Sequence, residues 1–173
     1  LPELPDRRPP AFTNAIIELG SGNITFFADE TLDFTNISER VKLNNFFLSD
    51  GPGQKNISLG DAIFLSGGGN QFKVQVSELK RVEAIEISNK SGGDGAPIVL
   101  DVSAEAVFDV VGNNNTDNLG VAVKEIADSR PPVVINVSID YNDGRVTVEA
   151  DEILITTSLF LTFTNTNFPL TEK

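Results

Sequence analysis

The 173-residue chain has no cysteine, histidine, methionine or tryptophan, and it has a single tyrosine. Without cysteine there is neither a disulfide framework nor a thiolate nucleophile. Without histidine, the usual nucleophile–histidine triads and the HExxH zinc motif are excluded as well. The glycine run Gly67-Gly68-Gly69 is not followed by lysine and Ser/Thr, so it is a turn and not a phosphate-binding loop.

Basic residues are also scarce. The chain has 13 Lys and Arg against 25 Asp and Glu, which gives a net charge of −12. A phosphate backbone requires a basic face, so we expect no nucleic-acid partner. No segment reaches the roughly 18–20 consecutive apolar residues that cross a bilayer, so we expect no membrane span. The chain begins at Leu1 and not at methionine, which indicates a processed protein or a fragment.

Acidic side chains are the remaining candidates for catalysis. Glycoside hydrolysis uses two carboxylates that face each other across a cleft. By residue type alone, the candidates are Asp101, Glu105, Asp109, Glu149, Asp151 and Glu152. Clefts that bind sugars usually display tryptophan or tyrosine, which this chain almost lacks. We therefore predict that the protein is not an enzyme and that it uses no cofactor.

Two loops, 140–144 and 113–118, carry oxygen ligands of the kind that calcium prefers. Neither loop matches the pattern of an EF-hand. Asn- and Asp-rich turns of this kind are common without a metal, because these side chains hydrogen-bond to their own backbone. The sequence therefore predicts no metal site.

Short apolar runs separated by turn residues dominate the chain. Phe72–Val76 alternates cleanly between apolar and polar residues. Val133–Ile139 alternates from Ile135 onward, and it and Arg145–Ala150 flank Asn142-Asp143-Gly144, a hairpin signal. The pattern predicts an all-β fold, a jelly-roll-like β-sandwich of about ten strands. A parallel β-helix is the rival interpretation, because GNITFFADETLDF and GRVTVEADEILIT look alike, although the segments between them do not keep that period.

Three segments are less regular than these runs. We expect Val82–Ile87 to be a strand and Ile153–Phe163 to be a long final strand. Leu119–Ala127 is the best helix candidate, because Val123, Ile126 and Ala127 could share one helical face.

The N-terminal part of the chain has an organisation of its own. Four prolines in Leu1–Pro10 hold an extended leader. The predicted strand Ala11–Leu19 follows, and Gly20-Ser21-Gly22 ends it. We expect a leader and strand over residues 1–19 and a single β-sandwich domain over residues 20–173. Whether Ala11–Leu19 stays in its own sheet or enters a neighbour's is the open question.

Asn-X-Ser/Thr sequons occur more often than chance would give. They predict N-glycosylation and hence an extracellular chain, whereas accidental sequons in an Asn-, Ser- and Thr-rich β protein are the alternative. The six sequons are at Asn23, Asn36, Asn56, Asn89, Asn114 and Asn136.

Two stretches carry a family resemblance. Ala11-Phe12-Thr13-Asn14 is followed by Asn23–Phe34 (NITFFADETLDF), and Ala150–Ile155 (ADEILI) precedes two further phenylalanines. This arrangement resembles the TasA/camelysin group of secreted filament proteins, which includes archaeal bundling pilins. In that group the mature chain opens with a strand of the Ala-Tyr/Phe-Phe type, and a segment of the form Asn-x-Phe-x-Ala-Gly-Thr-Leu-Asp-Leu follows it. A late segment has the form Gly-Asp-x-Leu-x-Leu and precedes an aromatic residue.

The resemblance implies a jelly-roll subunit of an extracellular, cell-surface filament, a pilus or biofilm-matrix fibre. Its partners would be identical subunits in a helical homopolymer, built by head-to-tail donor-strand complementation. The donor strand would contact the next subunit through Phe12, Ala15, Ile16, Ile17 and Leu19. The alternatives are a monomeric adhesin or carbohydrate-binding module and a viral capsid or decoration protein with an extended arm.

Overall fold

A computed structural model of the chain describes residues 5–153, and these residues confirm an all-β fold of ten strands with little helix. Of the predicted final strand, all but Ile153 lies outside the described residues. The strands are β1 Phe12–Glu18, β2 Asn23–Ala28, β3 Phe46–Ser49, β4 Ile57–Ser58, β5 Ile63–Gly68, β6 Gln71–Gln75, β7 Val99–Val102, β8 Asn118–Ile126, β9 Val134–Asp140 and β10 Arg145–Ala150. The helices are α1 Ile37–Arg40, the 3-10 turn η1 Leu43–Asn45 and α2 Glu78–Glu86.

The chain divides into two compact units, Leu1–Pro131 and Pro132–Lys173. The first contains an eight-stranded sheet and the second a two-stranded hairpin. The division falls at Arg130-Pro131-Pro132, where consecutive prolines cannot donate backbone hydrogen bonds and so interrupt strand pairing.

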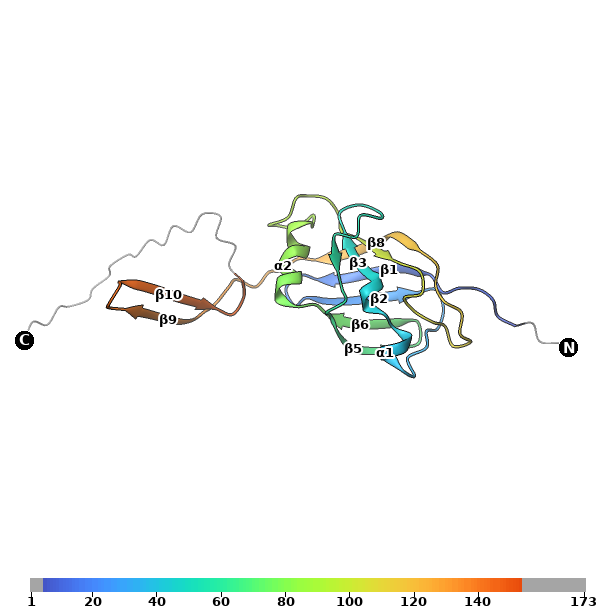
Figure 1. Cartoon of the computed structure of the whole chain (residues 1–173). Helices are drawn as coiled ribbons and strands as arrows, with labels where there is room; N and C mark the ends of the chain where they lie inside the picture. The colour runs from blue at the N-terminus through green and yellow to red at the C-terminus, as the bar shows by residue number, and fades with distance from the viewer. Residues whose placement is uncertain (1–4, 154–173) are drawn as a thin grey trace, which may run out of the picture. The chain divides into compact units, whose positions relative to one another are not determined.

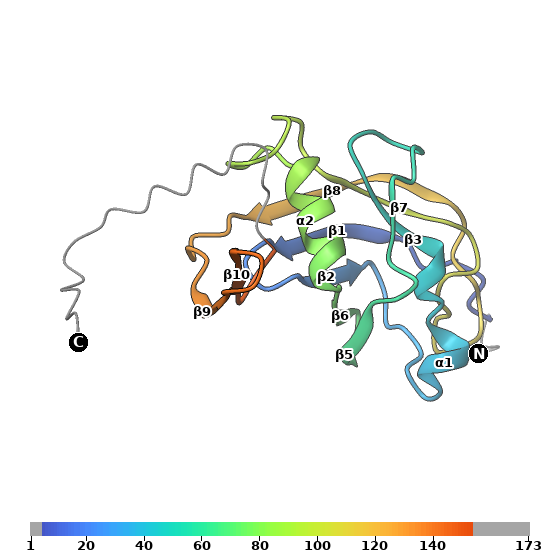
Figure 2. The same ribbon diagram turned by 60° about the vertical axis from the view of Figure 1, so that its left-hand side comes forward.

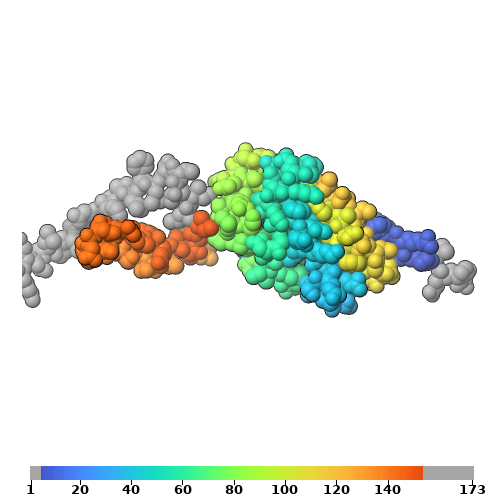
Figure 3. Space-filling model, viewed as in Figure 1, coloured from blue at the N-terminus to red at the C-terminus, as the bar shows by residue number. Residues whose placement is uncertain are grey.

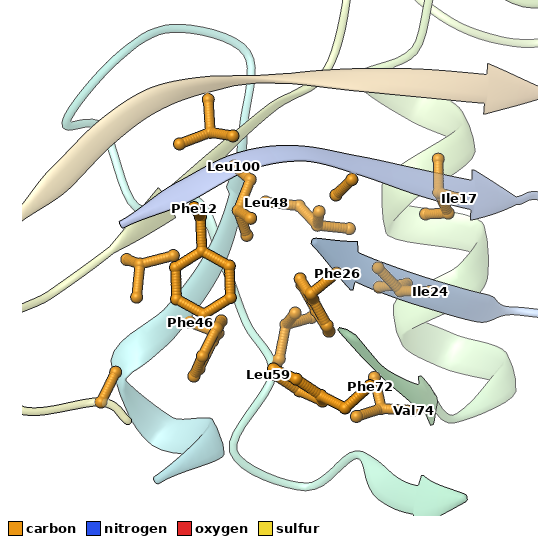
Figure 4. Packing of buried hydrophobic residues seen from close by; sticks show 14 of the residues in the cluster. Phe12, Ile17, Ile24, Phe26, Phe46, Leu48, Leu59, Phe72, Val74 and Leu100 are labelled. Carbon is orange, nitrogen blue, oxygen red and sulfur yellow. The ribbon is translucent and has the colours of Figure 1, made fainter. Parts of the chain in front are cut away.

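The sheet of the first unit has the order β4-β3-β7-β8-β1-β2-β6-β5, which places β1 near its middle (Figure 1). The sheet curls, so that β3 lies across from β1, β2 and β6 instead of beside them. Phe46 of β3 accordingly packs against Phe12, Phe26 and Phe72, with ring centroids 5.3, 5.2 and 5.7 Å away (Figure 4). One apolar core therefore lies between the two halves of the sheet, as in a β-sandwich.

Helix α2 replaces the strand expected over Val82–Ile87. Its N-cap is Ser77, whose side chain accepts a hydrogen bond from the backbone N–H of Lys80. An ion pair between Lys80 and Glu83 (2.7 Å) spans one turn of the helix. Val82 and Ala84 are buried, and the helix packs beside the turn between β1 and β2 (Figures 1 and 2). The expectation of a strand was wrong, because the cap at Ser77 starts a helix that runs through this segment.

Strand β8 likewise replaces the helix expected over Leu119–Ala127. Alternation with a period of two, and not a helical face, fits this segment. Val121 is buried and Val123 is partly buried, whereas Ile126 is 44% exposed. The strand pairs with β7 on one side and with β1 on the other, so tertiary pairing decides its conformation.

The second unit contains the predicted hairpin of β9 and β10. Val146 pairs with Ile139 and Val148 with Val137, which places these four side chains on one face. Ile139 and Val137 are 50% and 58% exposed, so this apolar face is uncovered within the described residues.

A buried carboxylate, Asp101 of β7, joins two loops to the sheet. It is fully buried, and it accepts hydrogen bonds from the backbone N–H of Gly53 (2.8 Å), the backbone N–H of Gly120 (2.9 Å) and the hydroxyl of Ser49 (2.8 Å). Burial by itself would raise the pKa of Asp101. The hydrogen bonds from Gly53, Gly120 and Ser49 outweigh that effect and hold the pKa below its usual range.

We predict that Asp101→Asn lowers the free energy of unfolding at pH 7 by about 2–3 kcal/mol, because hydrogen bonds to a charged acceptor are lost. The folded-state pKa lies below the unfolded value of about 3.9, so the carboxylate stabilises the fold above that pH. The contribution is lost as the pH falls through the folded-state pKa. Urea unfolding of both chains from pH 7 to pH 2 should show the difference shrink below about pH 4. A constant difference, or an equal loss in the exposed-site variant Glu39→Gln, would contradict this assignment.

Candidate subunit-contact site

Strand β1 contains the segment that the sequence predicts to contact another subunit. In the sheet it lies between β2 and β8. It runs antiparallel to β2, with Ile17 opposite Ile24, and parallel to β8, with Ala15 opposite Val123. No other pair of strands in the described residues is parallel. Both edges of β1 are therefore occupied, and without β1 two edges in the middle of the sheet would lose their backbone partners.

Four of the five predicted contact residues face the core. Phe12, Ala15, Ile17 and Leu19 are 4%, 0%, 0% and 1% exposed. Strict alternation would place Phe12 and Ala15 on opposite faces, because they are three residues apart. An irregularity in the pairing between Phe12 and Asn14 shifts the register and turns both side chains inward. Ile16 lies on the opposite face and is only partly buried.

Phe12 is the largest anchor of β1. Its ring makes edge-to-face contacts with Phe26, Phe46 and Phe72, at centroid distances of 6.3, 5.3 and 6.2 Å (Figure 4). Such aromatic contacts add to the free energy gained by burying the ring. The N-terminal strand thus supplies one member of the aromatic cluster at the centre of the core.

The C-terminal end of β1 is held by a tight turn and by Arg81. The backbone N–H groups of Ser21 and Gly22 both donate to the carbonyl of Glu18, and Gly22 has φ +69°, a conformation that favours glycine. Arg81 is 5% exposed, and its Nη1 donates to the carbonyl of Leu19 and to Asp128 Oδ2, both at 2.8 Å. This guanidinium ties the end of β1 to α2 and to the segment after β8.

The leader before β1 is also held against the body. Asp29 accepts a hydrogen bond from the backbone N–H of Ala11 (2.9 Å) and forms an ion pair with Arg8. Asn113 donates long hydrogen bonds to the carbonyls of Asp6 and Arg8. In Figure 3 the dark blue leader accordingly lies next to the yellow segment that contains Asn113. The proline-rich leader is thus fastened by side chains of two loops.

The six sequons differ in their accessibility. Asn23 is partly buried at the start of β2, and its Nδ2 donates to Glu18 (3.3 Å), so a glycan there would break a contact of the β1–β2 turn. The other five asparagines are exposed: Asn36, Asn56, Asn89, Asn114 and Asn136. These five can carry a glycan without disturbing the core.

The last strand of the sheet, β5, leaves an edge uncovered in the described part of the chain. Ile63 and Leu65 are 63% and 46% exposed there. Next to this edge is a shallow hollow of about 450 Å³, lined by Thr25, Ser66, Gly67, Gln71 and Lys73 among others. An open edge and a hollow with polar and apolar lining are features through which a β domain can take up an extended chain or a small ligand.

The six acidic candidates for catalysis are divided between the two units. Asp101, Glu105 and Asp109 belong to the first unit, where Asp101 accepts hydrogen bonds from two loops, and Glu149, Asp151 and Glu152 belong to the second. Among residues 5–153, no helix is long and apolar enough to cross a membrane. Comparison with protein-family models, with curated proteins and with solved structures finds no match to this chain.

We predict that Phe12→Ala lowers the free energy of unfolding by about 3–4 kcal/mol, because it removes a buried ring from the aromatic cluster. Ile16→Ala, on the other face of the same strand, should cost only about 1 kcal/mol. Chemical denaturation of the two variants measures this difference. Equal losses would show that the two faces of β1 are not distinguished in the way described.

Proposed function

We propose that the protein is a structural subunit of an extracellular, cell-surface filament, a pilus or biofilm-matrix fibre. Its N-terminal strand, Ala11–Leu19, would complete the sheet of the next copy. The observation that supports this proposal is the position of β1, which is close to the N-terminus in sequence yet near the middle of the sheet. Both of its edges are paired, and a short glycine turn, Gly20–Gly22, connects it to β2.

Exchange of β1 between copies would preserve nearly all of its contacts. A strand that enters the groove between β2 and β8 of another copy makes the same pairs there as in its own chain. The net cost lies in the connection, where the turn after Glu18 must open and its two backbone hydrogen bonds are lost. Opened, three residues span roughly 10 Å. Such exchange of an identical element is a common route to assembly.

The direction of the exchange determines the kind of assembly. If each copy donates β1 to one neighbour and accepts β1 from another, the contact is head-to-tail, whereas reciprocal exchange between two copies would close a two-fold dimer. A head-to-tail contact that does not close produces a fibre. The resemblance of Ala11–Asn14 and Asn23–Phe34 to the TasA/camelysin group supports the same assignment. Five exposed sequons suit an extracellular location.

A second candidate is a monomeric cell-surface adhesin or carbohydrate-binding module. The seating of β1 in the sheet of its own chain favours it, because a strand that is satisfied in its own chain has no need of a neighbour. In that case the hollow beside β5 is the place for a small ligand. The two candidates differ in whether β1 crosses between chains.

The absence of natural cysteine permits a direct test by disulfide formation. Ile16 on β1 lies opposite Thr25 on β2. We would prepare one chain with Ile16→Cys and another with Thr25→Cys, mix them under assembly conditions and oxidise the mixture. The filament proposal predicts cross-linked dimers, because only a strand that enters another copy brings these two cysteines together.

The matched control uses Thr25 and Lys73, which face each other on β2 and β6 and remain in one body. Mixed single-cysteine chains of this pair should give no dimer, whereas both cysteines in one chain should close an internal disulfide. The mixture of Ile16→Cys and Thr25→Cys chains could also give only monomers, while both cysteines in one chain form an internal disulfide. In that case β1 pairs within its own chain, and the monomeric module is favoured.

A further inference from the structure

The second unit repeats the beginning of the first unit in its sequence. An offset of 122 residues, the step from Arg8 to Arg130, aligns Arg8-Pro9-Pro10 with Arg130-Pro131-Pro132 and Ala28-Asp29-Glu30 with Ala150-Asp151-Glu152. Between these blocks the same offset pairs four further identical residues, namely Asn14 with Asn136, Ile17 with Ile139, Gly22 with Gly144 and Thr25 with Thr147. Likeness at one fixed spacing, without insertion or deletion, indicates an internal repeat.

The backbone repeats at the same positions as the sequence. Shifted by that offset, the bounds of β1 and β2 coincide with the bounds of β9 and β10. The irregular step in the strand pairing between Phe12 and Asn14 recurs between Val134 and Asn136. The two hairpins therefore share their register, including a departure from regular pairing that neither needs in order to be a hairpin.

Two contacts that hold the first hairpin are present in the second as well. Asp29 and Asp151 each accept a hydrogen bond from the backbone N–H of the residue before the first strand, at 2.9 and 2.8 Å. The backbone N–H groups of Gly22 and Gly144 each donate to the carbonyl of the last residue of that strand, at 2.9 and 2.8 Å. Their φ angles are +69° and +72°, in the region that favours glycine.

The apolar faces of the two hairpins differ in their exposure. Ile17 and Ile24 of the first hairpin are both 0% exposed, whereas the aligned Ile139 and Val146 are 50% and 40% exposed. A two-stranded hairpin is at best marginally stable in water unless its apolar face packs against another element. The face of β9 and β10 thus corresponds to a core face, and within the described residues it lacks a cover.

In the first unit, part of the cover comes from the segment that follows β2. Within residues 32–51, Leu32, Phe46 and Leu48 are 3%, 0% and 0% exposed. The ring of Phe46 lies 5.2 Å from the ring of Phe26 on the hairpin face (Figure 4). This segment therefore closes the core over β1 and β2.

The sequence after Ile153 continues the repeat without a gap. Under the same offset, residues 154–173 align with residues 32–51, and the three apolar positions of that cover are filled again by Leu154, Phe168 and Leu170. Because each segment follows its hairpin at the same distance along the chain, Phe168 can reach β10 as Phe46 reaches β2.

We propose that residues 130–173 are a second copy of the element that begins the first unit, and that the apolar face of β9 and β10 binds the chain's own segment 154–173. Phe168 takes the position of Phe46 on this face. Val134 and Val148 stand where the first hairpin has Phe12 and Phe26, so the ring of Phe168 packs against aliphatic side chains.

The repeat also explains why GNITFFADETLDF and GRVTVEADEILIT look alike. The two stretches are the same part of two copies of one domain start and not two coils of a β-helix. The inference concerns the single chain and stands whether or not the chain forms filaments.

The test uses the full chain, which has no natural tryptophan. Phe168→Trp places one fluorophore in the segment, and Tyr141→Trp, at a position that is 89% exposed, gives the reference for a solvated indole. We expect the Phe168→Trp chain to emit at shorter wavelength than the Tyr141→Trp chain and to be quenched less by acrylamide. The reason is that the docked indole is removed from water.

Two further substitutions in the Phe168→Trp chain decide where the indole docks. Val148→Asp places a charge on the apolar face and should abolish the blue shift. The matched control Thr147→Asp changes the adjacent, exposed position on the other face and should leave the shift intact. Emission equal to that of Tyr141→Trp, or a shift that Val148→Asp does not remove, would overturn the proposal. A shift that appears only at high protein concentration would assign the face to a second copy and overturn its assignment to segment 154–173.

Discussion

The structure depends on the double pairing of β1. This strand joins the β2–β6–β5 side of the sheet to the β8–β7–β3–β4 side, and its ring at Phe12 contacts phenylalanines from β2, β3 and β6. If β1 left its groove, both sides of the sheet would lose backbone hydrogen bonds, and the core would lose the ring of Phe12. The groove must therefore be filled by a strand of this sequence, whether from the same chain or from another copy.

Much of the fold could be predicted from short-range signals. The alternation of Phe72–Val76 and the Asn-Asp-Gly turn between β9 and β10 specify strands and a hairpin by local chemistry alone. The predictions failed where a weak pattern competed with a longer-range contact. Val82–Ile87 is helical through its cap at Ser77, and Leu119–Ala127 is extended because it pairs with two strands that are distant in sequence.

The candidate site was foreseen in part. The sequence identified β1 and its apolar residues, but the inward turn of both Phe12 and Ala15 depends on an irregular pairing that no periodicity reveals. The proximity of Asp6, Glu30 and Asp109 was equally hidden, because these residues come from segments that are far apart in the sequence. Arg81, which holds the end of β1, carries no sequence signal beyond its charge.

These features describe a strand that is paired along both edges and is held in addition at its two ends. At the C-terminal end the fastening is the Gly20–Gly22 turn with Arg81, and at the N-terminal end it is the leader with Asp29. The measurement that tests the account most directly is electron cryo-microscopy of the purified chain under assembly conditions. The account predicts filaments in which density runs from Leu19 of one copy to Asn23 of the same chain across a subunit boundary, with β1 in the next copy's sheet. Filaments in which β1 pairs with β2 of its own chain, or a sample of monomers at every concentration, would contradict it.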